Sequence, residues 1–444
     1  MELRDLVVTP VVIIIIYAIA YLIRRRVTDE INRVYFIPAL TVKIVGALTV
    51  GLIYQFYYKG GDTFSYHTHG SRHIWEAFME SPALGLKLIF TDRVDITGIY
   101  KYSSRILFFS DPGSYAIVRI AAILDLLTFS TYSSTALLFA AFSFVGMWML
   151  FLTFYKKYPI LHRWFAIAIF FVPSVFFWGS GLLKDTITLG CVGMATYAVA
   201  TIFLEKKPSV ATALVLLGSL SGLYFIKIYI LLTFLPSAFL WIMLSQMQSI
   251  RSVVFRVLSF PILMGLALTA SYYSVEKAGE GDSKYSLDNL ARTAQVTAYD
   301  IRYQTGKDAG SGYTLGELDG TFSSMIVLAP EAINVSLFRP YLWEANNPFM
   351  VLSALESFLL LAFFLYVLIG DNLRLGRALV QPDIVFALIF SVTFAFAVGV
   401  STFNFGTLVR YKIPLLPFFI IALRLLHFYS KRDRKFDEFD ETEK

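Results

Sequence analysis

One short polar stretch, GGDTFSYHTHG at residues 60–70, gathers residue types suited to acid–base or metal chemistry. It holds one aspartate, two histidines and three glycines, and it directly follows a long apolar run. A carboxylate can accept the proton of a hydroxyl group, and histidine nitrogens can bind a metal. Gly60 and Gly61 are expected to end the preceding helix, which makes Asp62 the first position outside it.

The chemistry of this stretch depends on whether it continues as a helix. In a helix, Asp62 and Tyr66 share one face, while His69 and His73 form a second pair one turn apart. A histidine pair at that spacing can bind zinc, with Asp62 as a further ligand. A carboxylate acting as a base and a half-buried loop without chemistry are the other interpretations. A divalent metal is therefore an option, no other cofactor is implied, and no residue is assigned as a metal ligand.

The composition indicates that membrane-spanning helices position these residues. Hydrophobic residues make up 57% of the 444 and charged residues only 16%, whereas soluble chains carry about 25% charged residues. The apolar runs are long, unlike the ten-residue alternation of a β-barrel, so we expect an all-α, polytopic transmembrane helical bundle. The single cysteine, Cys191, excludes a disulfide within the chain. We interpret the net charge of +6 as a record of topology, with no nucleic-acid partner.

We expect one integral membrane domain over residues 1–444, with about 11 spans. Short basic connections at 24–33, 155–163, 204–209, 249–256, 371–377 and 431–435 are assigned to the cytoplasm by the positive-inside rule. This places the N-terminus outside and the C-terminus in the cytoplasm. The first apolar run lacks a cleavage site and is expected to be retained. The predicted spans are 6–23, 35–57, 133–154, 164–181, 184–203, 209–226, 229–246, 252–273, 349–370, 383–402 and 412–428.

Two long segments, 58–132 and 274–348, are predicted to lie on the outer side. Within the first, Arg119 and Asp125 interrupt the apolar run at 115–131. Because charges are costly at mid-bilayer, we expect this run to form an interfacial helix and no span. The second segment is expected to form a cap over a site at the membrane surface.

Charged residues from distant parts of the chain fall at the outer boundary in this topology. The WGSGLLKD motif at 178–185 carries two of them, and the connection at 223–229 carries a third. These residues also have simpler interpretations. Basic side chains at the ends of spans often only extend to the membrane interface. Arg339 and Glu344, which flank Pro340, could instead form a structural ion pair in a rigid turn. The candidate substrate-binding residues are Lys184, Asp185, Lys227, Arg339, Glu344 and Arg410, together with Tyr66 and His67.

The layout resembles the membrane-embedded GT-C glycosyltransferases. The resemblance lies in GGDTFSYH, with Asp62 as the acid of the first outer loop, and in the helix expected at 115–131. FWGSGLLKDTITLG and FRPYLWEANNPFMVLSALES are also similar to segments of bacterial multispan proteins from envelope polysaccharide clusters. The resemblance implies a sugar donor linked to polyprenyl phosphate, a glycan, lipid or protein acceptor, contact with membrane lipids, and a location in the bacterial inner membrane.

The resemblance also implies roles for individual residues. Asp62 would be the catalytic base on the acceptor hydroxyl. Lys184, Lys227, Arg339 and Arg410 would stabilise the phosphate that leaves. The resemblance therefore favours a glycosyltransferase or a polymerase of repeat units.

Two other functions stay open. A transporter or flippase of a lipid-linked or anionic solute would place charges at mid-membrane on broken helices and would contain internal repeats, which we do not find in the sequence. A scaffold of an envelope assembly would need neither Asp62 nor Lys184. No P-loop, dinucleotide fingerprint or GxSxG motif occurs, so ATP-driven transport by this chain is not expected.

Overall fold

The computed structural model describes residues 3–91, 97–248, 287–305, 311–316, 318–370 and 378–442. These residues are helical almost throughout, and the described part holds no strand, only an isolated bridge between Gly312 and Asn404. The chain divides into two compact units. Unit 1 comprises residues 1–198 and 210–227, and unit 2 comprises residues 199–209 and 228–444.

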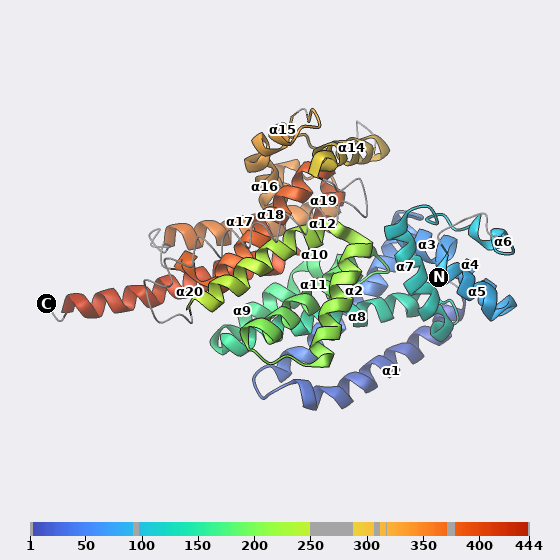
Figure 1. Ribbon diagram of the computed structural model, residues 1–444, viewed down its shortest axis with the longest axis horizontal. Coiled ribbons are helices and arrows are strands. Elements are labelled where there is room, and N and C mark those ends of the chain that lie inside the picture. Colours follow the sequence, from blue (N-terminus) through green and yellow to red (C-terminus); the bar gives the residue numbers. More distant parts are fainter. Residues whose placement is uncertain are drawn as a thin grey trace. The chain divides into compact units, whose positions relative to one another are not determined.

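In unit 1 the long helices α2 and α8 lie side by side (Figure 1). α1 packs on α8, and α10 packs on α2. The elements up to the start of α12 are α1 Leu3–Val27, α2 Arg33–Leu52, η1 Ile53–Tyr57, α3 Asp62–Tyr66, η2 His67–Ser71, α4 Arg72–Glu80, α5 Pro82–Phe90, α6 Tyr100–Ser103, α7 Pro112–Thr128, α8 Tyr132–Lys157, η3 Pro159–Leu161, α9 His162–Ala166, η4 Ile167–Phe171, α10 Pro173–Trp178, α11 Lys184–Val199 and α12 Val210–Gln248.

Unit 2 is built around α18, which contacts α14, α16 and α20, while α17 packs on α16 and α20. Trp241 of α12 stacks on Phe386 and donates from Nε1 to Asp383 Oδ1 at 2.8 Å. The elements are η5 Ala200–Leu204, the second half of α12, α14 Leu287–Thr305, α15 Phe322–Val327, α16 Ala329–Phe338, η7 Leu342–Glu344, α17 Pro348–Gly370, η8 Ala378–Val380, α18 Pro382–Thr402, α19 Phe405–Tyr411 and α20 Leu415–Thr442.

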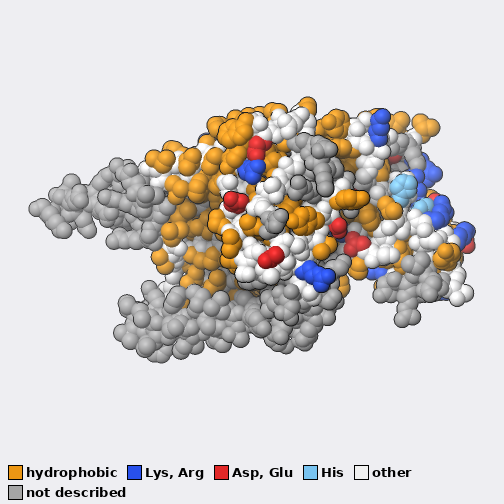
Figure 2. Space-filling view, turned by 90° about the horizontal axis from the view of Figure 1, so that it is seen from above, with side chains coloured by type: hydrophobic (Ala, Val, Ile, Leu, Met, Phe, Trp, Pro, Cys, Tyr) orange, Lys and Arg blue, Asp and Glu red, His pale blue; other side chains and the backbone are white. Residues whose placement is uncertain are grey.

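The expected helical membrane bundle is confirmed. Seven of the described helices are long and apolar enough to cross a membrane, or eight if the bent pair α19–α20 forms one span. Their outward faces stay apolar: Leu6 and Leu22 of α1 are 74% and 77% exposed, and Leu359 of α17 is 66% exposed. Figure 2 shows hydrophobic side chains over large areas of one face, as contact with lipid requires.

Most predicted spans coincide with long helices, but four differ. The predicted span 164–181 is wrong as one helix, because Val172 is extended and Pro173 starts the new helix α10. The spans 209–226 and 229–246 are the two halves of α12, which is broken at Lys227 (φ −147°, ψ 79°). The last span is preceded by α19, which is bent from α20 by 66°. The predicted span 252–273, the loops 249–256 and 371–377 and residues 274–286 lie outside the described residues.

A buried lysine stabilises the break before α11. Lys43 of α2 is 1% exposed, and its Nζ donates to the Gly179 carbonyl at 2.7 Å and to Ser143 Oγ at 3.0 Å. Gly179 ends α10, where backbone carbonyls lack helical partners. A cation at the C-terminus of a helix also interacts favourably with the helix dipole. Lys43 thus supplies the donor that a helix end inside an apolar bundle needs.

Three glycines let α8 and α11 touch backbone to backbone. A Cβ added at Gly146 of α8 would lie 2.1 Å from the Gly190 carbonyl oxygen, and one at Gly193 would lie 2.2 Å from the Gly146 oxygen. Small residues at such a crossing let membrane helices approach closely.

Gly146→Ala is expected to destabilise the protein by about 1–3 kcal/mol, because backbone atoms must move to make room for the methyl group. Gly218→Ala is the matched control, since nothing lies within 4 Å of a Cβ there and alanine favours a helix by up to about 1 kcal/mol. Thermal unfolding of the two purified variants measures the difference. An unchanged midpoint in Gly146→Ala would contradict the backbone contact.

Candidate functional site

The 60–70 motif begins with the predicted helix end. α2 runs into the π-helical turn η1, and Gly60 and Gly61 follow with φ of 140° and 119°. The ring of Tyr54 lies 2.8 Å from the position of a Cβ at Gly61. Glycine is therefore needed there both for its backbone angle and for its size. Asp62 starts α3, is partly exposed, and follows the end of the second predicted span as expected.

The segment does not continue as one regular α-helix through the histidines. His69 has non-helical angles (φ −103°, ψ 20°) within the π-helical turn η2, which separates α3 from α4. His69 is exposed, whereas His73 is buried and its Nδ1 lies 3.2 Å from Glu76 Oε2. Within the described ranges, no group of three His, Cys, Asp or Glu residues is placed to hold a metal ion.

Tyr66 and His67, both predicted to bind substrate, face the protein interior. Tyr66 is 3% exposed and packs against Phe108, with ring centroids 5.0 Å apart. His67 is fully buried, with its ring edge-on to Tyr132. The Tyr132 hydroxyl lies 2.7 Å from Thr63 Oγ1. Tyr66 and His67 therefore anchor the Asp62 segment from inside the protein and do not lie at its surface.

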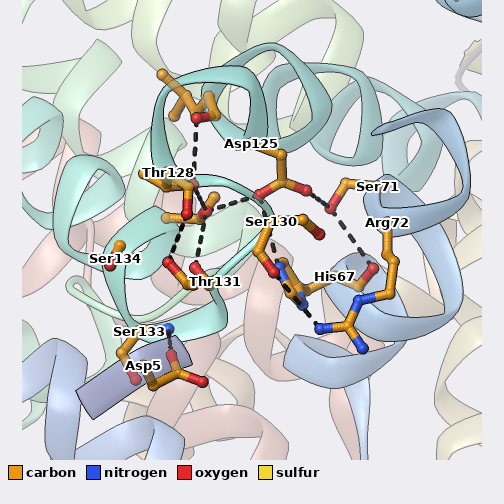
Figure 3. Close-up of polar contacts among 12 residues, drawn as sticks. Asp5, His67, Ser71, Arg72, Asp125, Thr128, Ser130, Thr131, Ser133 and Ser134 are labelled. Carbon is orange, nitrogen blue, oxygen red and sulfur yellow. Dashed lines mark hydrogen bonds and ion pairs between the residues drawn. The ribbon is translucent and has the colours of Figure 1, made fainter. Parts of the chain in front are cut away.

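Asp125 of α7 joins three elements in a buried polar cluster (Figure 3). It accepts hydrogen bonds from Ser71 Oγ of η2 and from Thr135 Oγ1 of α8, both at 2.7 Å. Its Oδ1 also lies 3.5 Å from His67 Nε2. Asp125 and His67 are each 0% exposed, and neither ring nitrogen of His67 has a hydrogen-bond partner. The expected helix at 115–131 therefore exists, as α7, but its aspartate is enclosed by protein.

Three predicted site residues of unit 1 come together with a fourth that was not predicted. Lys227 Nζ lies 2.5 Å from Asp185 Oδ1, and Lys184 Nζ lies 2.9 Å from Asp111 Oδ2. The first pair is buried, with side chains 7% and 1% exposed. The second opens toward solvent, with Lys184 17% and Asp111 52% exposed. The cluster thus contains a buried pair with no net charge, Lys227 and Asp185, and a partly exposed lysine, Lys184.

The N-terminus of α7 lies against this cluster. Asp111 caps α7 by accepting a hydrogen bond from Ser114 N at 3.1 Å, and Pro112 takes the first helical position. A Cβ at Gly113 would lie 3.0 Å from the Ile226 carbonyl oxygen and 3.3 Å from Lys184 Nζ. Lys184 therefore lies beside the positive end of a helix, an arrangement that favours anions.

The charge of Lys184 also acts on Asp111. Burial alone would raise the pKa of the Asp111 carboxyl, but the hydrogen bonds from Ser114 and the charge of Lys184 outweigh burial and lower the pKa. Asp111 is therefore ionised at neutral pH.

The two predicted motifs of unit 1 meet at one aromatic pair. Tyr54, which covers Gly61, packs edge-on against Trp178, with centroids 6.4 Å apart. Trp178 starts the WGSGLLKD motif that ends at Lys184 and Asp185. Asp62 and Lys184 are therefore held by neighbouring segments of the same unit.

The remaining predicted residues belong to unit 2. Arg339 and Glu344 form a two-pronged ion pair, with Arg339 Nε at 3.1 and 3.0 Å from the two carboxylate oxygens. Glu344 also accepts from Tyr341 N at 2.8 Å. The structural ion pair considered as an alternative is thus present. Arg410, in the last turn of α19, is partly exposed, with its guanidinium 5.9 Å from the Tyr411 ring centre.

Sequence reasoning missed Lys43, Asp111 and the site role of Asp125. Lys43 was a detectable signal, because a lysine within a predicted span is unusual. Asp111 before Pro112 is also a detectable signal, because an aspartate followed by proline is typical of a helix start. The partners of Asp125 could not be predicted from the sequence, because nothing in the sequence marks Ser71 and Thr135 as residues that contact it.

No family model matches the chain, and no curated protein or solved structure shows a significant match to it.

Asp125→Asn is expected to loosen the Asp62 segment. An asparagine side chain cannot accept from both hydroxyls with the strength of a carboxylate, and a hydrogen bond to a charged group contributes about 1.5–3 kcal/mol. Hydrogen exchange of residues 62–71 should accelerate about ten- to hundredfold, measured by mass spectrometry. The control is Asp383→Asn, which removes a buried carboxylate from unit 2 and should leave exchange at 62–71 unchanged. Equal exchange in both variants would refute the assignment.

The Arg339–Glu344 pair predicts a defined pH dependence. Burial would raise the pKa of Glu344, but hydrogen bonds from Arg339 and Tyr341 N lower it below the usual 4.5. A carboxylate with a lowered pKa stabilises the fold above its usual pKa, and this contribution is lost as pH falls through the lowered value.

Wild type should therefore unfold at a higher temperature than Glu344→Gln at neutral pH. The difference should shrink as pH falls below 4.5 and vanish once the pH is below the lowered pKa of Glu344. Glu80→Gln is the control. The pKa of Glu80 is also lowered, by hydrogen bonds from Lys101 and Tyr102, but its pair is exposed and screened. Its effect should be smaller, and a larger effect than that of Glu344→Gln would count against the prediction.

Proposed function

We propose that this membrane protein is a glycosyltransferase, or a polymerase of repeat units, that uses a sugar donor linked to polyprenyl phosphate. The observation that supports this most is that one unit contains both a partly exposed carboxylate, Asp62, and a partly exposed lysine at a helix N-terminus, Lys184. Both are held by segments that meet at Tyr54 and Trp178. The product would be an envelope or extracellular glycan.

The proposed reaction assigns one task to each group. The oxygen of an acceptor hydroxyl attacks the anomeric carbon of the donor, and its proton passes to the Asp62 carboxylate. The bond from that carbon to the phosphate oxygen breaks, and the phosphate leaves with the electron pair. Lys184 and the N-terminus of α7 stabilise the charge that gathers on the phosphate.

The geometry supports different tasks for the other basic residues. Lys227 is buried and neutralised by Asp185, so we assign it to the support of Lys184 and not to phosphate binding. Arg339 is engaged by Glu344. We retain Arg410 as a candidate for the phosphate on the basis of the sequence pattern.

The proposed setting is a bacterial inner membrane, with about 11 spans, the N-terminus outside and the C-terminus in the cytoplasm. The donor would be reached from the outer leaflet. Its partners would be the lipid-linked donor, a glycan, lipid or protein acceptor, and membrane lipids. The GT-C type of architecture belongs to the same proposal.

A transporter or flippase of an anionic, lipid-linked solute is the second candidate. It is favoured by two broken helices with a buried lysine at the break: Lys227 within α12, and Lys412 between α19 and α20. Discontinuous helices with charged groups are typical of transporter binding sites.

Asp62→Ala and Lys184→Ala are expected to abolish extracellular glycan while membrane protein levels stay normal. Lys184→Arg should retain part of the activity, because it keeps the charge. Glu80→Ala and Lys101→Ala are matched controls, because they break an exposed ion pair in the segment 58–132 that also contains Asp62. Both should leave glycan output unchanged. Glycan output is measured by immunoblot and sugar analysis. Normal output in both Asp62→Ala and Lys184→Ala would refute the assignment.

The position of the accumulated donor separates the two functions. A transferase defect should leave the lipid-linked sugar in the outer leaflet, where a membrane-impermeant oxidant reaches it. A flippase defect should leave it in the inner leaflet, protected from that oxidant.

A further inference from the structure

A three-layer stack of side chains lies between α16 and α17 in unit 2. The Arg339 guanidinium lies 5.7 Å from the centre of the Tyr341 ring, and the Tyr341 ring stacks on Trp343 with centroids 4.8 Å apart and planes at 25°. Both separations are typical of attractive cation–π and offset-stacked pairs. Trp343 is the outermost layer.

The stack is fixed from behind by several contacts. Glu344 binds the Arg339 side chain in two places and accepts from Tyr341 N at 2.8 Å. The Tyr341 hydroxyl lies 3.1 Å from Asn334 Nδ2. The Arg339 carbonyl accepts from Ser357 Oγ at 3.1 Å and from the buried Lys412 Nζ at 3.3 Å. The two lower layers therefore have little freedom to move.

Trp343 nonetheless presents its ring to solvent, with 79% of the residue exposed. The chain that follows it is polar: Glu344 is partly exposed, Asn346 is exposed, and Asn347 caps α17 by accepting from Met350 N at 2.9 Å. On the other side, Leu342 is 43% exposed. A tryptophan that only anchors a protein at the membrane interface needs an apolar environment on one side. A rigid ring with charged and amide groups beside it suits a partner that is apolar on one face and polar at its rim.

We propose that the outer face of Trp343 is a binding subsite for a sugar ring. The C–H groups on one face of a pyranose would stack on the indole, and its hydroxyls would meet the Glu344 and Asn346 side chains. The proposal rests on the proposed function for the role of the subsite, which is to bind a segment of the glycan.

Binding without turnover tests this subsite. Full-length protein in nanodiscs is applied to an array of defined bacterial oligosaccharides, and the oligosaccharide bound best is then titrated in solution. Wild type should bind, Trp343→Ala should bind about tenfold more weakly or worse, and Trp343→Phe should fall between them because a smaller ring remains. Trp164→Ala, which removes another exposed tryptophan from unit 1, is the matched control and should bind like wild type.

Two outcomes would overturn the proposal. One is equal binding, or none, by wild type and Trp343→Ala. The other is membrane contact: the fluorescence of Trp343, taken as the difference between wild type and Trp343→Phe, would be quenched by brominated lipids and not by aqueous iodide.

The Asp62→Ala variant separates this subsite from the proposed function. If Asp62→Ala abolishes glycan production but binds the array as wild type does, both proposals hold. If Asp62→Ala is silent while Trp343→Ala loses binding, the transferase assignment fails and the sugar subsite stands.

Discussion

The hydrogen bond from Lys43 to the Gly179 carbonyl is the constraint on which the rest of unit 1 depends. A break in a helix frees backbone groups, and in an apolar bundle no water is present to satisfy them. Lys43 supplies a donor within α2, at the end of α10. The chain can therefore turn at residues 179–183 and restart as α11 with Lys184 and Asp185 at its first two positions. The candidate site exists because this turn is possible.

The need of buried charged side chains for polar partners is the second constraint. An isolated buried ion is costly, so each buried charge in the site has a defined partner. Lys227 has Asp185, and Lys412 has a carbonyl and a hydroxyl. Asp125 has two hydroxyl donors and the nearby His67 ring. What distinguishes Lys184 is that its partner, Asp111, is half exposed.

The amino-acid sequence predicted the membrane bundle and much of the candidate site, because both follow from local signals. Apolar length predicted most of the long helices, Gly60 and Gly61 predicted the end of the second span, and WGSG predicted the turn before Lys184. Pairings between distant segments were not predictable. Nothing near Asp125 in sequence indicates Ser71, and nothing near Lys184 indicates that Asp111, 73 positions earlier, is its partner. The π-helical turns at 53–57 and 67–71 were also missed, since they arise from packing and not from residue type.

Helix α7 has a mechanical consequence. Its capping residue Asp111 pairs with Lys184 at one end, and Asp125 holds His67 and Ser71 near the other. A helix of 17 residues is about 26 Å long and hardly compressible. In the proposed function, any shift of α7 that accompanies anion binding at Lys184 would therefore be transmitted to the residues that follow Asp62.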